Sequence, residues 1–323
     1  MIKEKDREWL RQVFGSAVRF DEIMGRHTYF RIGGPADAWV EPENEPQLEA
    51  LLKWARHNAI PYLLVGGGTN LLVRDGGIRG LVIHLGRMSA DVQWVQQGAA
   101  VIVSSGAGVP TKRICALALR HGWQGMNFAL GIPGTLGGAI IMNAGTARGC
   151  MADVVEEVTM MSTAGEKVEL DRRSLNFDYR RLRLPEQRSG RAASSAVLVA
   201  ARLILNRGDR EKIRQQARQL MRGRSKTQPT WQPSAGCFFK NPSKDQPAGR
   251  LIDQAGLKGF RVGDAQVSLR HANFIINRGK ARAADILAVA ARVQETVKDR
   301  FHIDLVPEVC IVGEEKTGAQ KSF

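Results

Sequence analysis

The chain has 323 residues, 43% of them hydrophobic, and its 47 Lys and Arg against 32 Asp and Glu give a formal net charge of +15. That length can form two or three domains with packed cores. The charge favours an anionic partner such as nucleic acid, an acidic membrane surface or a polyphosphate ligand, but a solvated basic surface explains it equally well. The cysteines are far apart and form no CxxC pair, which excludes a disulfide framework or zinc site and favours a reduced, cytosolic protein: Cys115, Cys150, Cys237 and Cys310.

Neither a secretory signal nor a membrane span is predicted. The first fifteen residues mix charged and apolar side chains and contain no apolar run. Residues 123–147 lack ionised side chains, but Pro133 and four glycines interrupt the middle of that stretch. It is therefore interpreted as a glycine-rich loop region and not as a spanning helix.

The predicted elements alternate irregularly between helix and strand. Apolar residues at helical spacing predict a helix over 45–59 that Asn44 caps, and Gly122 is expected to end a helix over 110–120. Further helices are predicted over residues 209–226, which are strongly basic, and over residues 285–297. Short apolar runs predict strands at residues 62–65, 71–73, 81–85, 101–103, 153–161, 196–205, 274–276 and 303–306.

This order lacks a regular βαβ alternation, so the predicted fold class is α+β in two halves, with a boundary near residue 215 where the composition changes. A dinucleotide-binding unit is rejected because Gly106-Ala107-Gly108 has Thr111 at the third glycine position and no acidic residue where the ribose contact belongs. The Walker pattern is also absent, since Gly279-Lys280 is followed by alanine.

Two glycine-rich loops are the first candidate ligand sites, GGGTN at 66–70 and GIPGTLGG at 131–138. Glycine lets the backbone approach a ligand and turn its N–H groups inward, which suits a diphosphate. Thr69 and Asn70 add side-chain donors. The alternative is that both segments are tight turns without a ligand.

Three further segments carry chemistry. Residues 234–242 place a thiol, an ammonium group and an amide within five residues, although a buried cysteine in a turn is the commoner meaning. Residues 179–183 are either a basic surface strand or an anion contact. Glu308 is either a charge at a strand end or a buried catalytic acid, and the residues alone leave this open.

Together these motifs resemble one family, the UDP-N-acetylenolpyruvoylglucosamine reductases. The resemblance covers nearly the whole chain, from TYFRIGG at 28–34 to PEV at 307–309. Its elements follow the family's order: GGGTNLL, GIPGTLGGA, NFDYR, GCFFKNP, AGRLIDQAGLKG and PEV. Each motif alone is weak, but six in this order are highly specific.

The resemblance implies an FAD-binding fold of the vanillyl-alcohol-oxidase type in two subdomains, over residues 1–90 and 91–214, and an α+β substrate-binding domain over 215–323. It implies non-covalent FAD, NADPH as hydride donor, a UDP-sugar substrate, no metal, no nucleic acid or membrane partner, and a role in peptidoglycan synthesis in the cytoplasm. A monomer is expected.

It also implies roles for individual residues. Arg180 matches the arginine that polarises the enolpyruvyl group, Cys237 the proton donor and Glu308 the second catalytic carboxylate. The expected cofactor contacts are Gly66, Gly67, Gly68, Thr69, Asn70, Gly131, Ile132, Pro133, Gly134, Thr135, Gly137 and Gly138. The expected substrate contacts are Tyr179, Arg222, Lys226, Lys240 and Asn241.

The chain departs from the family pattern in two residues and one loop. Cys237 stands where serine is common, and Cys310 stands where arginine is common. The interval from Arg180 to Arg222 is too short for the extra tyrosine loop of one subgroup, so the chain is placed in the subgroup without that loop.

In the implied mechanism, NADPH transfers hydride to flavin and leaves. The enolpyruvyl sugar then accepts hydride at C3, and Arg180 and Glu308 stabilise the resulting enolate while residue 237 protonates C2. One rival is an alcohol oxidase of the same fold, which would lack GCFFKNP and PEV. The other is a nucleic-acid-binding protein, which the 6% aromatic content and the absence of a recognition motif disfavour.

Overall fold

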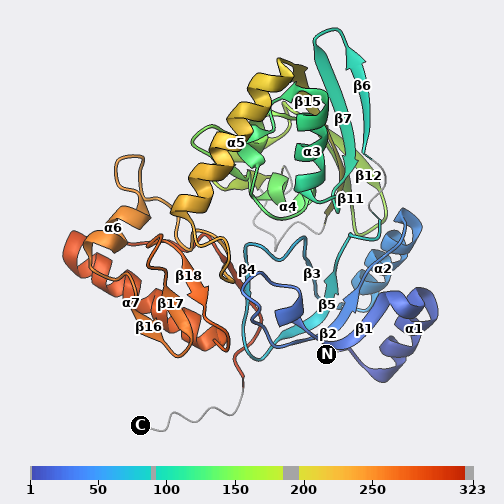
Figure 1. Cartoon of the computed structure of the whole chain (residues 1–323). Helices are drawn as coiled ribbons and strands as arrows, with labels where there is room; N and C mark the ends of the chain where they lie inside the picture. Colours follow the sequence, from blue (N-terminus) through green and yellow to red (C-terminus); the bar gives the residue numbers. More distant parts are fainter. Residues whose placement is uncertain (1, 89–91, 185–195, 317–323) are drawn as a thin grey trace. The chain divides into compact units, whose positions relative to one another are not determined.

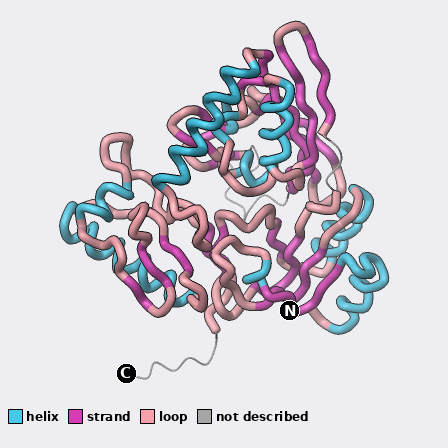
Figure 2. Tube along the Cα trace, in the orientation of Figure 1, coloured by secondary structure: helices cyan, strands magenta, loops and turns pink. Residues whose placement is uncertain are grey.

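The computed structural model describes residues 2–88, 92–184 and 196–316, and the chain divides into two compact units. Unit 1 comprises residues 1–19, 39–67 and 81–222, and unit 2 comprises residues 20–38, 68–80 and 223–323. Each unit is thus built from segments far apart in the sequence. Figure 1 shows their helices and strands, with labels on many of them, and Figure 2 distinguishes helix, strand and loop along the trace.

Unit 1 contains the large antiparallel sheet, in the order β12-β11-β15-β7-β6, with β8 also paired to β15. Buried and half-buried residues alternate strictly along β7, as expected for a strand with one face on the core. Helix α4 packs against β7 and β15, and helix α3 packs against β8. The bounds are β6 (Gln93–Gln97), β7 (Ala100–Gly106), α3 (Thr111–His121), β8 (Trp123–Gln124), α4 (Leu136–Ile141), β11 (Val155–Met161), β12 (Lys167–Asp171), β15 (Val197–Arg207) and α5 (Arg210–Thr227).

A second sheet has the order β1-β2-β5-β3, and its strands β1, β2 and β5 have residues in both units. Strand β3 runs parallel to β5, with Tyr62 opposite Leu81. In unit 1 the helices α1 and α2 are joined by Trp9 and Trp54, whose rings stack 4.6 Å apart. The bounds are α1 (Glu4–Phe14), β1 (Val18–Ile23), β2 (Pro35–Val40), α2 (Glu45–His57), β3 (Tyr62–Leu64) and β5 (Ile78–Ile83).

The remaining short elements form turns and hairpins. Strands β9 (Gly145–Thr146) and β10 (Gly149–Cys150) pair with each other, as do β13 (Asn176–Asp178) and β14 (Arg181–Arg183). The 3-10 turns are η1 (Gly15–Ala17), η2 (Met24–Arg26), η3 (Asn127–Ala129) and η4 (Met151–Asp153).

Unit 2 is organised around helix α7 (Ala283–Phe301), which packs against the antiparallel sheet β16-β17-β18. One face of α7 carries apolar residues at helical spacing, and their side chains are fully or almost fully buried: Ile286, Val289, Val293 and Val297. Both carboxylate oxygens of Asp75 accept hydrogen bonds from the first turn of α7, at 2.9 and 3.0 Å. The other bounds are β4 (Leu71–Val73), α6 (Ala248–Gln254), β16 (Arg261–Val262), β17 (Ala265–Val267), β18 (Ile275–Asn277) and β19 (Cys310–Val312), which lies parallel to β4.

The structure confirms most predicted elements and corrects two. The Asn44 side chain accepts from Gln47 N and begins α2, and Gly122 ends α3 in the left-handed conformation. No strand forms over residues 303–306; the last strand among the described residues is β19, because β4 offers its backbone partners only from Cys310 onward. The segment 131–138 is a loop only as far as Thr135, after which α4 begins. The division into three domains, over residues 1–90, 91–214 and 215–323, stays a prediction.

Within the described ranges, no helix has the length and apolar character needed to cross a bilayer, and no group of three or more His, Cys, Asp or Glu side chains is placed to hold a metal ion. All four cysteines are free thiols.

Candidate functional site

The two glycine-rich loops meet in unit 1. A Cβ atom added to Gly66 would lie 2.4 Å from Oγ1 of Thr135, closer than any real contact allows. The close approach therefore requires glycine at position 66. Gly66 and Thr135 thus bring the two loops into direct contact.

The loop at 131–138 is held along the segment that follows β7. Leu136 N donates to Val109 O and Gly137 N donates to Ala107 O, both at 2.8 Å. A Cβ at Gly137 would lie 2.8 Å from the Cβ of Ala107, so glycine is required here as well. The turn Gly106-Ala107-Gly108, which does not match a dinucleotide-binding motif, is thus a support of this loop that sequence reasoning missed.

Unit 1 presents backbone donors suited to a phosphate. In the described part of the chain, the N–H groups of Gly66, Gly67, Gly134 and Thr135 donate to no protein acceptor. Gly131 and Gly134 have φ angles of 73° and 125°, conformations that direct successive N–H groups away from a regular ladder. A backbone with several unused donors and no side chain in the way is the kind of surface that binds a diphosphate. These residues therefore fit the diphosphate of FAD.

The other predicted cofactor residues lie around these donors or in unit 2. Ile132 is half-buried, while Pro133 and Gly138 are exposed; Gly138 N donates to Thr135 Oγ1 at the start of α4. Gly68, Thr69 and Asn70 belong to unit 2. A Cβ on Gly68 would lie 1.8 Å from the carbonyl oxygen of His27, so this third glycine serves a close backbone contact.

Arg180 occupies the turn between β13 and β14 with a φ of 58°, a left-handed conformation that costs a non-glycine residue of order 1 kcal/mol or more. Its guanidinium NH1 donates to Gly145 O at 3.0 Å, and the guanidinium carbon lies 5.3 Å from the ring centroid of Tyr179. Asn143 extends the same support, because its amide donates to Asp178 O at 2.9 Å. The arginine is thus positioned by residues 143–145, which follow α4 and its C-cap Met142.

Strain at this turn argues against the surface-strand interpretation of residues 179–183 for Arg180 itself. Arg181 and Arg183, in contrast, lie in the exposed strand β14. Functional sites commonly contain residues held in rare backbone conformations. Tyr179 is 53% exposed and is available for a ligand.

In unit 2, Cys237 lies in a segment clamped by buried side chains. Phe238 and Phe239, each 1% exposed, anchor the segment in the core with their rings 5.0 Å apart. The buried Asn273 side chain accepts a hydrogen bond from Phe239 N at 2.9 Å and donates one to Phe239 O at 2.8 Å. Cys237 and Lys240, on either side of the two phenylalanines, are only half-buried. The functional groups are therefore presented from a rigid backbone.

Glu308 lies beside this segment. Glu308 N donates to Phe238 O at 2.8 Å, and Lys240 N donates to Val306 O at 2.9 Å. Asn70 joins them, since its amide donates to Glu308 O at 3.0 Å and its own carbonyl accepts from Cys310 N at 2.9 Å. Unit 2 thus brings together Asn70, Cys237, Lys240 and Glu308, which are up to 238 positions apart in the sequence. Arg180 belongs to unit 1 and Glu308 to unit 2.

Arg224, in the last turns of α5, is a residue that sequence reasoning missed. Burial lowers the pKa of its guanidinium, and the charge of a thiolate at Cys237 would raise it, so the two groups lie within electrostatic reach. Arg224 is half-buried, whereas the predicted contacts Arg222 and Lys226 on the same helix are exposed. A cation beside a thiol favours the thiolate form. The sequence offered one sign of this role, because Arg224 stands two positions after the predicted substrate contact Arg222.

The remaining predicted contact, Asn241, has a structural bond: its side-chain oxygen accepts from Ala248 N at 3.0 Å, at the start of α6. The amide nitrogen keeps its two donors for a ligand. The chain has three thiols besides Cys237. Burial raises the pKa of Cys115 to about 12, and burial also raises the pKa of Cys150 and of Cys310.

Comparison with known proteins agrees with this arrangement. Residues 36–171 match the model of an FAD binding domain, and residues 228–312 match that of the UDP-N-acetylenolpyruvoylglucosamine reductase C-terminal domain. The chain is 45% identical over 309 residues to the UDP-N-acetylenolpyruvoylglucosamine reductase of Desulfosudis oleivorans, covering 95% of this chain and 98% of the relative. It is 46% identical over 295 residues to that of Geobacter metallireducens, covering 91% and 94% of the two chains.

The solved structure of the enzyme from Thermus caldophilus matches with a TM-score of 0.76 and 36% identity, covering 92% of this chain and all of the other. The fold and the glycine-rich loops define an FAD-containing oxidoreductase with a mixed α and β architecture. Within that class, the chain belongs to the UDP-N-acetylenolpyruvoylglucosamine reductase family.

Proposed function

We propose that this chain catalyses the NADPH-dependent reduction of UDP-N-acetylglucosamine enolpyruvate to UDP-N-acetylmuramate, in peptidoglycan synthesis in the cytoplasm. The observation that carries the proposal is similarity over 95% of the chain to a reductase of this name, supported by the segment in which Phe238, next to Cys237, accepts a hydrogen bond from Glu308 N. We further propose that the protein acts as a monomer with three domains over residues 1–90, 91–214 and 215–323.

The cofactor residues have a defined task. The unused N–H groups of Gly66, Gly67, Gly134 and Thr135 would bind the FAD diphosphate, with Gly68, Thr69, Asn70 and the rest of 131–138 as its neighbours. Bound FAD supplies the transfer of hydride from NADPH to the enolpyruvyl group. The chain's own residues position the substrate and handle its charge and proton.

Hydride addition at C3 of the enolpyruvyl group leaves negative charge on its carboxylate and C2. Arg180, oriented by Gly145, would stabilise this charge through its guanidinium, and Glu308 would do so by a hydrogen bond in its protonated form. Cys237 would then deliver the proton to C2, and Arg224 would stabilise the thiolate that remains. Tyr179, Arg222, Lys226, Lys240 and Asn241 are the proposed substrate contacts.

The test is NADPH oxidation by the purified protein with and without UDP-N-acetylglucosamine enolpyruvate. We expect a yellow protein from which acid releases the flavin into solution, and NADPH turnover that depends on the enolpyruvyl substrate. Colourless protein that cannot be reconstituted with FAD would contradict the proposal. So would turnover with a small alcohol in place of the sugar nucleotide.

A further inference from the structure

The N-terminal part of helix α5 carries a row of cations that none of the roles above uses. Arg210, Arg214 and Arg218 are spaced four residues apart, so they follow one another along the helix surface at intervals of about 6 Å. The row continues through Arg222 and Lys226, which are proposed substrate contacts. Arg210 and Arg218 are exposed and Arg214 is half-buried, and all three belong to unit 1.

The charges of this row are poorly balanced within the protein. Among the described residues, Arg210 and Arg214 form no ion pair, and Arg218 approaches only Glu211, at 3.8 Å and with both side chains mostly exposed. Glu211 is also the only carboxylate within α5. Like charges four residues apart on a helix repel each other and destabilise it. The row therefore weakens α5 unless an anionic partner lies along it.

The first turn of α5 is fixed by groups outside the row. Asp209 accepts hydrogen bonds from Glu211 N at 2.9 Å and from Lys212 N at 3.1 Å, which satisfies two donors at the start of the helix. Ile213 and Ala217 are buried and pack the helix against the rest of unit 1.

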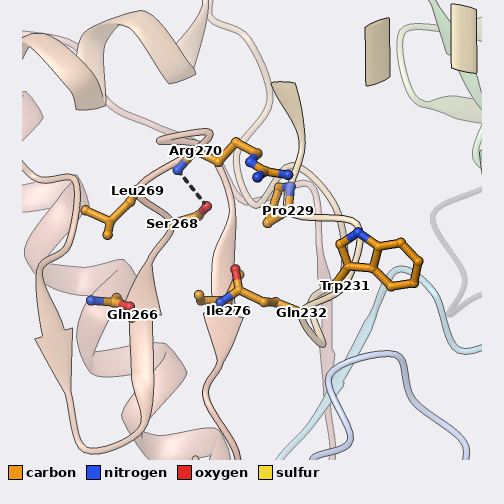
Figure 3. Close-up of a pocket in the computed structure, with 8 residues that line it drawn as sticks. All are labelled: Pro229, Trp231, Gln232, Gln266, Ser268, Leu269, Arg270 and Ile276. Atoms are coloured by element: carbon orange, nitrogen blue, oxygen red, sulfur yellow. Dashed lines mark hydrogen bonds between the residues drawn. The ribbon is translucent and has the colours of Figure 1, made fainter. Parts of the chain in front are cut away.

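Within unit 2, the last turn of α5 is held by Arg270. Its NH1 group donates to the carbonyl oxygens of Ser225 at 3.1 Å and Gln228 at 3.4 Å. Figure 3 shows this guanidinium beside Pro229, which directly follows Gln228. Both ends of α5 are thus fixed without Arg210, Arg214 or Arg218, so these arginines are not needed to position the helix.

An exposed methionine lies next to the row. Met221 is three residues after Arg218 and seven after Arg214, which places it on the same side of the helix, and its side chain is 46% exposed. Methionine and arginine are enriched at protein interfaces, whereas lysine is depleted there. A flexible apolar side chain beside these arginines therefore fits a partner that carries an apolar residue among carboxylates.

Two other anionic partners fit this surface less well. Helix α5 has no aromatic residue on which a nucleotide base could stack. Its apolar side, with Ile213 and Ala217, is buried and cannot enter a lipid surface. A second helix with carboxylates at every fourth position, in contrast, presents them at the same interval of about 6 Å as the row.

We propose that Arg210, Arg214, Arg218 and Met221 form a docking surface for an acidic helical segment of a partner protein. Carboxylates of that segment pair with the arginines, and an apolar residue between them packs against Met221. Arginine suits such pairs because its planar guanidinium can hold a carboxylate with two hydrogen bonds. None of the four residues has a role in the proposed reductase activity.

The test is titration of a labelled helical peptide with the FAD-loaded protein at physiological salt, followed by fluorescence anisotropy. The peptide is alanine-based and carries glutamate at every fourth position with one leucine between them. The triple variant with Arg210→Gln, Arg214→Gln and Arg218→Gln should weaken binding about tenfold, because each exposed ion pair contributes only a small factor.

The matched control makes the same change of net charge at exposed arginines elsewhere on the chain: Arg56, Arg173 and Arg300. Replacing these three by glutamine should leave the affinity within about twofold, because salt screens charges that do not contact the peptide. Equal loss of affinity in both triple variants would overturn the proposal, since attraction by net charge alone would explain it.

Met221 distinguishes a protein partner from general attraction of polyanions. Met221→Ala should weaken binding of the leucine peptide about threefold, and it should hardly change binding of a peptide with alanine in place of that leucine, since only the first pair loses an apolar contact. Equal effects on both peptides would contradict the proposed packing against Met221.

Three further outcomes would overturn the proposal. A marked fall in the melting temperature of the triple variant at 210, 214 and 218 would show that the arginines stabilise α5. A single-stranded oligonucleotide or an anionic phospholipid vesicle that binds through the row, while the peptide does not, would establish that partner instead. A salt-sensitive fall in kcat/KM for the enolpyruvyl sugar, with unchanged peptide affinity, would assign the row to attraction of the substrate.

Discussion

Arg180 and Cys237 are positioned in opposite ways. Arg180 projects from a two-residue turn in a left-handed backbone conformation, and its guanidinium donates to the carbonyl oxygen of Gly145 in β9. Cys237 lies next to two fully buried phenylalanines on a segment fixed by Asn273. The position of Arg180 thus depends on a strained turn, and that of Cys237 depends on the core of unit 2. Substitutions around the two residues should therefore affect activity and stability differently.

The largest effect is expected at Cys237. Cys237→Ala should reduce turnover ~10²–10⁴-fold, since that is the usual contribution of a general acid. Cys237→Ser, nearly the same size, should keep substantial activity. Steady-state turnover of both variants is the measurement, and a fully active Cys237→Ala protein would end the proton-donor assignment.

A thiol reagent sharpens this test. With a pKa of about 12, only ~10⁻⁴ of Cys115 is thiolate at pH 8, and the raised pKa of Cys150 and of Cys310 also slows their alkylation. The unmodified protein should therefore lose turnover as Cys237 is alkylated, and Cys237→Ser should resist the reagent. Equal inactivation of both would show that another cysteine is responsible.

Arg180→Ala and Glu308→Ala should each slow reoxidation of the reduced flavin by the enolpyruvyl substrate ~10²–10³-fold, the usual cost of one preorganised charge-stabilising group. Bleaching of the flavin by NADPH should persist, because the enolate exists only in the second half-reaction. Stopped-flow absorbance follows both steps. Arg181→Ala and Glu314→Ala, at exposed positions, are the matched controls, and equal loss in both half-reactions would mean that the roles are misassigned.

Asn273→Ala should lower the free energy of unfolding by about 2–4 kcal/mol, because it leaves the buried N–H and C=O of Phe239 without partners, each at a cost of about 1–3 kcal/mol. Chemical denaturation measures this. Asn176→Ala, on the exposed strand β13, should cost less than about 0.5 kcal/mol. A similar small loss in both variants would mean that the segment carrying Cys237 is not held by Asn273.

The smallest effects are expected at Lys240 and Asn241. Alanine at either position should raise KM for the sugar nucleotide about tenfold with little change in kcat, because a contact made equally in the ground and transition states is lost. Asn241→Ala should also destabilise the start of α6 by about 1 kcal/mol through loss of its bond to Ala248. An unchanged KM in both variants would remove these residues from the site.

Local signals in the sequence were sufficient for much of the molecule. The cap at Asn44, the stop at Gly122 and the apolar spacing of α7 each act over a few residues, so they specify their elements without knowledge of the rest of the chain. The strand predicted over residues 303–306 was wrong for the opposite reason. A strand needs a partner, and β4, more than 200 positions earlier, pairs only from Cys310 onward.

By itself, the sequence determined the family, the glycine-rich loops and the residue types that the chemistry requires, because these are encoded in short motifs whose order can be read along the chain. Only the tertiary structure decided which groups lie together. It placed Gly66 against Thr135, directed Arg180 by Gly145, joined Asn70 to Glu308 and brought Arg224 within electrostatic reach of Cys237. Such contacts depend on how segments far apart in the sequence pack around a shared core. The spacing of residues along the chain does not reveal which distant segments come together.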